Sequence, residues 1–197
     1  MPPFASRGGE KLEHALSVFG IDVAGLDCAD LGCSTGGFTD CLLRRGAGRV
    51  FCVDTGYGVL DWKLRKDPRV VVMERTNAMH VSLPVPVSLV VIDVGWTRQK
   101  HILPAARRLL IREGRIVSLV KPHYEADAAM LRGGILPDDR LTEVLDRVNR
   151  DIAESGLCVA AQTPSPIRGQ KGNAEVLYLL QLMHDDPRRA ATIVPQS

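Results

Sequence analysis

The chain has 197 residues, of which 45% are hydrophobic and 24% charged, as is typical of a folded globular domain. A chain of this length buries roughly 70% of its unfolded surface, so we expect its core to need no disulfide or metal. The net charge of +2 and the aromatic content of 5% exclude a protein that coats nucleic acid along its length or stacks bases over a broad platform, while a local basic cleft stays possible.

Apolar residues alternate between helical and strand periods along the chain. The predicted helices are 12–19 ended by Gly20, 35–45 ended by Gly46, 102–110 with its end at Arg112 to Gly114, and 141–152 ended by Gly156. The predicted strands are 26–31, 49–53, 70–73, 87–92, 116–120, 157–161 and 176–182. This alternation predicts an α/β fold, with a parallel sheet of about seven strands covered by helices on both faces.

The cysteine content and the first residues of the sequence indicate the cellular compartment of the protein. The five cysteines are odd in number and none forms a C-x-x-C pair, so we expect neither a disulfide framework nor a zinc site. The first ten residues lack the apolar core of a signal peptide. The longest nearly apolar stretch, Leu83 to Ile92, is too short and too broken by proline to span a bilayer. The sequence therefore predicts a cytoplasmic soluble domain without a membrane span.

The first predicted strand runs into a glycine-rich turn, Asp30-Leu31-Gly32-Cys33-Ser34-Thr35-Gly36-Gly37-Phe38. In an open α/β sheet, ligands bind at the carboxyl ends of the strands, and glycines there let a ligand approach the backbone. Ser34 replaces the second glycine of the dinucleotide pattern G-x-G-x-x-G, and no Gly-Lys-Ser/Thr of a P-loop follows. The spacing D-x-G-x-x-x-G favours S-adenosylmethionine (SAM), a cofactor that has no phosphates to hold.

Asp54 ends the second predicted strand, 22 residues after Gly32. A carboxylate at this place can accept hydrogen bonds from both hydroxyls of a ribose, as the acidic residue of a dinucleotide site does. The glycine turn alone could equally be a structural turn with a capping aspartate. The turn and Asp54 together favour SAM.

Four more charged residues stand at the ends of predicted elements. Asp93 follows strand 87–92 and Lys121 follows strand 116–120, which places both at carboxyl ends of neighbouring strands. Lys11 lies at the start of the first helix, and Glu175 opens the last strand. Taken singly, each has a structural alternative as a helix cap, a solvated surface charge or an edge charge.

The phrase from Asp30 to Leu43 resembles the SAM motif of the FtsJ-like ribose 2′-O-methyltransferases, and within them it is most similar to the TlyA hemolysin-type rRNA methyltransferases. The other matching phrases are residues 6–12, 53–58, 60–65, 74–78, 92–94, 119–122, 165–167 and 171–175. The resemblance implies a Rossmann-like, seven-stranded SAM-dependent methyltransferase domain. We expect that domain to occupy residues 1–184, with 185–197 as a flexible tail.

The resemblance also implies the roles of individual residues. The Lys-Asp-Lys-Glu catalytic tetrad of the family falls on Lys11, Asp93, Lys121 and Glu175. The residues expected to hold SAM are Asp30, Gly32, Ser34, Thr35, Gly36, Gly37, Phe38, Asp54, Asn77 and Asp93. Asn77 lies where the family approaches the adenine of the cofactor.

Two departures from the family concern the acceptor. TlyA-type proteins carry a small N-terminal RNA-binding domain, whereas this sequence begins almost at the catalytic domain. Residues 93–100 depart from the usual Asp-Val-Ser-Phe-Ile-Ser-Leu, and 121–125 read Lys-Pro-His-Tyr-Glu in place of Lys-Pro-Gln-Phe-Glu. Both stretches flank the acceptor side, so the chemistry is expected to be kept while the substrate stays open.

Three hypotheses follow. The first is a 2′-O-methyltransferase of a structured RNA, with Lys121 as the base and Lys11 as the neighbouring cation, while Asp93 and Glu175 orient the amines and the acceptor. Basic residues expected to grip RNA phosphates are Lys63, Arg65, Arg168 and Lys171.

The second hypothesis is an O-methyltransferase of a small hydroxylated or phenolic metabolite, favoured by the low net charge and by Trp96, His123 and Tyr124 near the acceptor. The third is a non-catalytic SAM-binding module, which the intact tetrad disfavours. We expect no metal in any of them, because two amines and two carboxylates make a poor set of magnesium ligands.

Overall fold

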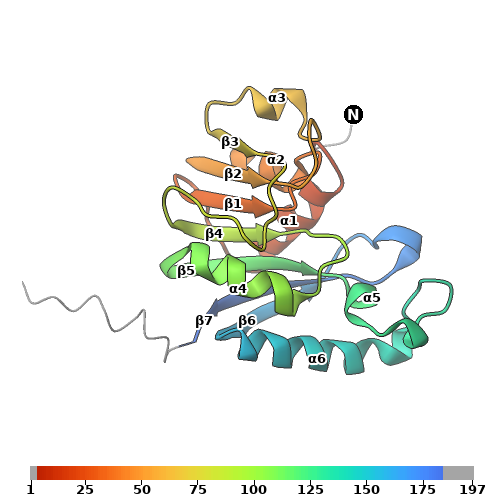
Figure 1. The fold of residues 1–197 in the computed structure, drawn as a ribbon. Helices are drawn as coiled ribbons and strands as arrows, with labels where there is room; N and C mark the ends of the chain where they lie inside the picture. The colour runs from red at the N-terminus through yellow and green to blue at the C-terminus, as the bar shows by residue number, and fades with distance from the viewer. Residues whose placement is uncertain (1–3, 184–197) are drawn as a thin grey trace, which may run out of the picture.

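Seven strands form the centre of the protein, whose structure is a computed structural model describing residues 4–183. They are β1 (Asp27–Leu31), β2 (Arg49–Val53), β3 (Val70–Met73), β4 (Val87–Ile92), β5 (Leu110–Val120), β6 (Leu157–Pro164) and β7 (Val176–Leu182). Their order in the sheet is β3-β2-β1-β4-β5-β7-β6 (Figure 1). The strand number and the α/β class agree with the sequence prediction.

The sheet is mixed, whereas the strand pattern predicted a parallel sheet. Strands β1 to β5 pair in parallel, but β7 lies antiparallel to both β5 and β6. The reason is the connection: residues 165–175 join β6 to β7 with a short 3-10 turn and no crossover helix, so β7 returns beside β6 in the opposite direction.

Helices cover both faces of this sheet. On one face lie α1 (Gly8–Val18) and α2 (Gly37–Arg44), and on the other α4 (Gln99–Leu109) and α6 (Leu141–Glu154) (Figure 1). The short elements are α3 (Trp62–Arg65), α5 (Pro122–Glu125) and 3-10 turns at Ala128–Met130, Asp138–Arg140 and Gln170–Gly172.

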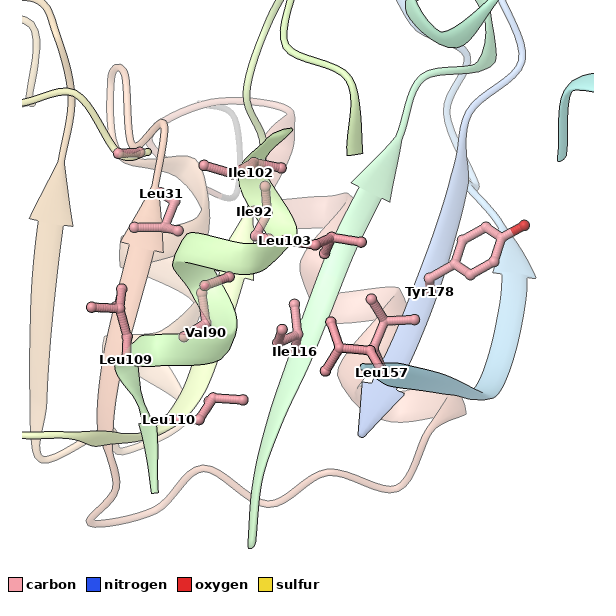
Figure 2. Packing of buried hydrophobic residues seen from close by; sticks show 14 of the residues in the cluster. Leu31, Val90, Ile92, Ile102, Leu103, Leu109, Leu110, Ile116, Leu157 and Tyr178 are labelled. Carbon is pink, nitrogen blue, oxygen red and sulfur yellow. The ribbon is translucent and has the colours of Figure 1, made fainter. Parts of the chain in front are cut away.

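Alternate residues of each strand face opposite helix layers. Val90 and Ile92 of β4 pack with Ile102 and Leu103 of α4, as Figure 2 shows, whereas Leu89 belongs to the core beneath α1 and α2. Burial on both faces is why the central strands read as nearly continuous apolar runs.

Several predicted boundaries were wrong. The helix predicted to run past Leu110 ends at Leu109, because Leu110 is extended (φ −80°, ψ 145°) and pairs with Val87; β5 therefore starts six residues before the predicted Ile116. Strand β6 continues to Pro164 because it pairs with β7 along its whole length. Helix α2 begins at Gly37, since Gly36 has the left-handed φ of +99°.

Within residues 4–183, no helix is long and apolar enough to cross a bilayer. The predicted flexible tail, 185–197, lies outside the described residues.

The strand order reverses between β1 and β4, and this reversal positions the site. Connections leave these two strands in opposite directions along the sheet, which opens a crevice at their carboxyl ends. The glycine turn follows β1, Asp54 follows β2, Asp93 follows β4 and Lys121 follows β5. Four sequence-distant segments therefore meet at one edge.

Candidate active site

A cavity of about 460 Å³ occupies this crevice, within the roughly 300–1,000 Å³ of small-molecule sites. Nine of the ten residues expected to hold SAM line it: Asp30, Gly32, Ser34, Thr35, Gly37, Phe38, Asp54, Asn77 and Asp93. Gly36 does not line it and instead packs its backbone against Leu60 and Leu64. Thr76, Met79 and Ile102 also line the cavity but were not among the predicted site residues. Thr76 lies inside a matched phrase, whereas Ile102 carries only the periodic signal of a helix core.

Gly32 brings the ends of β1 and β4 into close approach. Its φ is +85°, and a Cβ there would lie 2.7 Å from the carbonyl oxygen of Asp93. An L side chain would therefore face both backbone strain and a clash with main-chain atoms that cannot swing away. The glycine keeps the crevice open at the point where a ligand would approach the backbone.

Asp54 is oriented by two backbone N–H groups. Ser34 N–H donates to its Oδ2 at 2.8 Å and Gly56 N–H donates to its Oδ1 at 2.7 Å. Each carboxylate oxygen keeps a second lone pair, so the group can still accept from a diol in the cavity. The bond from Ser34, a residue with φ of +48°, also fixes the glycine turn to the end of β2.

Asp30 is a fully buried carboxyl group at the base of the cavity. Thr39 Oγ1 donates to its Oδ2 at 2.7 Å, while Oδ1 lies buried with no hydrogen-bond partner. Burial raises the pKa of Asp30 to about 7, and the negative charges of Asp93 and Asp54 act in the same direction. An unpartnered acceptor beside a cavity suits a ligand with a cationic donor, such as the ammonium group of SAM.

The predicted tetrad forms two ion pairs. Lys121 Nζ lies 2.5 Å from Asp93 Oδ1 and donates a hydrogen bond to the carbonyl oxygen of Val94 at 3.3 Å. Lys11, the fourth residue of α1, forms a buried ion pair with Glu175, the residue directly before β7.

The two pairs line one cleft of about 290 Å³, together with Arg7, which the sequence analysis did not single out. Asp93 and Lys121 line the cofactor cavity as well. The structure thus brings all four predicted residues together, and one ion pair forms the boundary between the two hollows.

Gly169 supports this arrangement from the β6–β7 connection. A Cβ at residue 169 would overlap the Oε1 atom of Glu175, so only glycine leaves room for that carboxylate. The backbone of the loop therefore defines where Glu175, and through it Lys11, can lie.

The expected phosphate-gripping residues are not one cluster. Arg65 forms an ion pair with Glu74, which also accepts from the N–H groups of Gly58 and Val59, so its guanidinium is engaged in the fold. Arg168 donates to the carbonyl oxygen of Gly172 at 2.9 Å. Lys171 borders a cavity next to the tetrad cleft.

Residues 4–182 match the family model of the FtsJ-like methyltransferases. The chain belongs to the FtsJ-like methyltransferase family. Its cofactor is S-adenosylmethionine, and the cavity fits that group: it offers an oriented carboxylate for a ribose, an unpartnered buried acceptor and a glycine-lined crevice.

Similar proteins of this family include the 16S/23S rRNA (cytidine-2′-O)-methyltransferase TlyA of Mycobacterium tuberculosis, 42% identical over 187 residues, with 92% of this chain and 70% of that protein covered. Hemolysin A of Brachyspira hyodysenteriae is 41% identical over 181 residues, covering 88% of this chain and 75% of that protein. Across the curated relatives the covered share falls to 65%, so the chain spans about two thirds to three quarters of their length.

Solved structures of other proteins share this fold. A candidate hemolysin of Streptococcus thermophilus superimposes with a TM-score of 0.90 at 38% identity, over 93% of this chain and 69% of that one. An S-adenosylmethionine-dependent methyltransferase of Listeria monocytogenes, with a TM-score of 0.66 and 16% identity over 90% of this chain and 100% of that one, shares the fold.

Among the described residues, no group of three His, Cys, Asp or Glu side chains lies close enough together to hold a metal ion.

Proposed function

We propose that this methyltransferase transfers the methyl group of SAM to a ribose 2′-hydroxyl of a structured RNA, with ribosomal RNA as the substrate. The observation that carries the proposal is the shared boundary: Asp93 and Lys121 line both the cofactor cavity and the cleft of the tetrad. An acceptor in that cleft lies next to the cofactor without having to enter its cavity.

In the proposed reaction, bound SAM supplies a methyl group already activated by its sulfonium. The acceptor oxygen would form a bond to the methyl carbon as the carbon–sulfur bond breaks, and the hydroxyl proton would pass to the amine of Lys121. That amine can accept a proton only in its neutral form. The remaining rate enhancement comes from positioning the acceptor in line with the methyl group.

The charge of the cleft supports RNA over a small metabolite. Arg7, Lys11 and Lys121 line it, three cations against the two carboxylates of Asp93 and Glu175. A polyanion gains from such a surplus, and its binding would weaken with salt. Two relatives carry rRNA (cytidine-2′-O)-methyltransferase names, which agrees with this substrate and with the cytoplasmic location expected from the sequence.

The test is transfer of tritium from methyl-labelled SAM to ribosomal subunits and to their naked RNA. We expect label that ribonuclease releases as a 2′-O-methylated nucleotide, with a rate that falls as salt rises. Label in the small-molecule fraction of a metabolite extract, with none in RNA, would favour the alternative acceptor and contradict the proposal.

A further inference from the structure

A second hollow of about 400 Å³ adjoins the tetrad cleft but contains none of the tetrad residues. It lies between the β4–α4 loop, helix α5 and the loops at 131–134 and 171–173. Trp96, His123 and Tyr124 line both this hollow and the tetrad cleft, so these three side chains form a boundary that the two share. We call it the side pocket.

The shared wall is a cluster of three aromatic rings in mutual contact, tilted by 33° between Trp96 and Tyr124 and by 46° between His123 and Tyr124. The ring centroids of Trp96 and Tyr124 are 4.9 Å apart and those of His123 and Tyr124 are 4.1 Å apart. Trp96 is 85% exposed and has a φ of +63°. Residues other than glycine adopt this left-handed backbone conformation only with conformational strain. A large ring held in water in this way offers a flat surface to a ligand, and every nucleobase can stack on such a surface.

The pocket also offers polar groups suited to a nucleotide. Lys171, on its rim, forms no ion pair among residues 4–183, and its Nζ donates one long hydrogen bond of 3.5 Å to the carbonyl oxygen of Gly133. His123 is buried, its Nδ1 has no hydrogen-bond partner, and burial with the charge of Lys121 lowers its pKa. A neutral imidazole can donate to a ligand through one ring nitrogen.

We propose that the side pocket binds the nucleotide next to the one that is methylated, with its base stacked on the Trp96–Tyr124 wall and its phosphate near Lys171. This inference rests on the proposed RNA substrate, because adjacent nucleotides of one strand need two sites that share a boundary. The wall meets that need, since the same rings face the tetrad cleft on one side and the side pocket on the other.

The binding test uses Trp96 as its own reporter. The chain has two tryptophans, and Trp62→Phe on α3 leaves Trp96 alone to respond. We expect millimolar cytidine, adenosine, guanosine or uridine monophosphate to quench its fluorescence saturably, and the corresponding nucleosides to bind more weakly. Lys171→Ala should abolish the difference between nucleotide and nucleoside, because it removes the cation and leaves the rings. Tyr124→Ala should weaken both by about tenfold or more, as expected for the loss of one base–aromatic stack.

Lys66→Ala, made in the same Trp62→Phe protein, is the matched control, since it removes a cation that lies over the ring at position 62, away from the side pocket. It should leave nucleotide binding unchanged. Because Lys171 is an exposed surface residue, its variant tests the proposal even if Tyr124→Ala fails to fold.

Methyl transfer to ribosomal RNA, measured on the same preparations, separates the two proposals. One outcome is that RNA is labelled, Trp96 responds to no nucleotide, and Lys171→Ala leaves the KM for RNA unchanged. This outcome would overturn the side-pocket inference and leave the proposed function intact. Quenching by phenol but not by nucleotides would also overturn it. Nucleotide binding that Lys171→Ala weakens, in a protein that labels no RNA, would support the pocket and count against the proposed function.

Discussion

Lys121 is fixed at the wall between the cofactor cavity and the tetrad cleft by Asp93 at 2.5 Å and by the carbonyl oxygen of Val94 at 3.3 Å. If its amine removes the proton of the acceptor, Lys121→Ala should lower the rate of methyl transfer by about 10²–10⁴-fold, as the loss of a general base does. SAM affinity and the melting temperature should stay near those of the native protein. Single-turnover rates and calorimetry measure the two effects separately.

Lys121→Arg distinguishes a base from a positive charge. Guanidinium keeps its proton at any workable pH and cannot accept another, so the arginine variant should fail nearly as completely as the alanine variant. Substantial activity with arginine would remove Lys121 from the role of base and leave positioning as the main source of rate.

Asp54 lends itself to a test of cofactor binding. Asp54→Ala removes the expected ribose acceptor and releases the N–H groups of Ser34 and Gly56, so we expect SAM binding to weaken by roughly 1.5–3 kcal/mol. Asp61→Ala is a matched control, because Asp61 also accepts from a backbone N–H, that of Lys63 at 2.8 Å, but does not line the cavity. Equal calorimetric affinities of the two variants would show that Asp54 does not bind the ribose.

At this scale, the motifs predicted which residues gather at the site, but not how they pair. Lys11 and Glu175 are 164 positions apart, and no local pattern predicts that they form one buried ion pair while Lys121 pairs with Asp93. Arg7 was missed because a basic residue before a helix reads as a surface charge until the cleft brings it beside the tetrad.

At the scale of the secondary-structure elements, the loop between β6 and β7 positions Glu175 of the tetrad through Gly169. Gly169→Ala places a methyl group against the carboxylate of Glu175, which is buried and paired with Lys11 and has little freedom to move. We expect the turnover number to fall by about tenfold or more, the loss expected when a positioning contact moves by an ångström, while SAM affinity is unchanged. A variant with normal turnover would mean that the position of Glu175 does not matter for the reaction.

The central elements were predictable and their boundaries were not, for reasons visible in particular residues. Val87 to Ile92 is buried on both faces, so its apolar run alone defines β4. Leu109 and Leu110 continue a helical period, yet Leu110 leaves the helix to pair with Val87. The antiparallel β7 follows from the length of the loop before it, a constraint that residue periodicity does not contain.

For the molecule as a whole, Glu125 makes stability depend on pH. It is buried, accepts from the N–H of Gln99 at 2.8 Å, and burial raises its pKa to about 7 from an ordinary value of 4.5. Between these values the folded protein binds a proton that the unfolded chain has released, so stability falls as pH rises from about 4.5 to 7. The full difference is on the order of 3 kcal/mol.

Glu125→Gln keeps an oxygen for the Gln99 N–H and carries no charge at any pH. We expect it to melt several degrees above the native protein at pH 8 and at the same temperature at pH 5. Asp30, whose pKa is raised in the same direction, contributes equally to both proteins and cancels in the comparison. Parallel melting curves with no pH-dependent gap would show that Glu125 is ionised in the folded state.

The ion pair between Lys11 and Glu175 joins the first helix to the last strand. All residues that line the cofactor cavity lie between Ser6 and Lys121, so a ribosome making this protein has delivered every one of them well before it reaches residue 175. The tetrad, in contrast, lacks one member until β7 begins to be synthesised. This contact has one of the longest sequence separations in the fold. The entropic cost of closing the loop between its two residues can therefore be offset only when nearly the whole chain has been synthesised. The nascent chain therefore acquires the parts for holding its cofactor first and the complete tetrad for methyl transfer last.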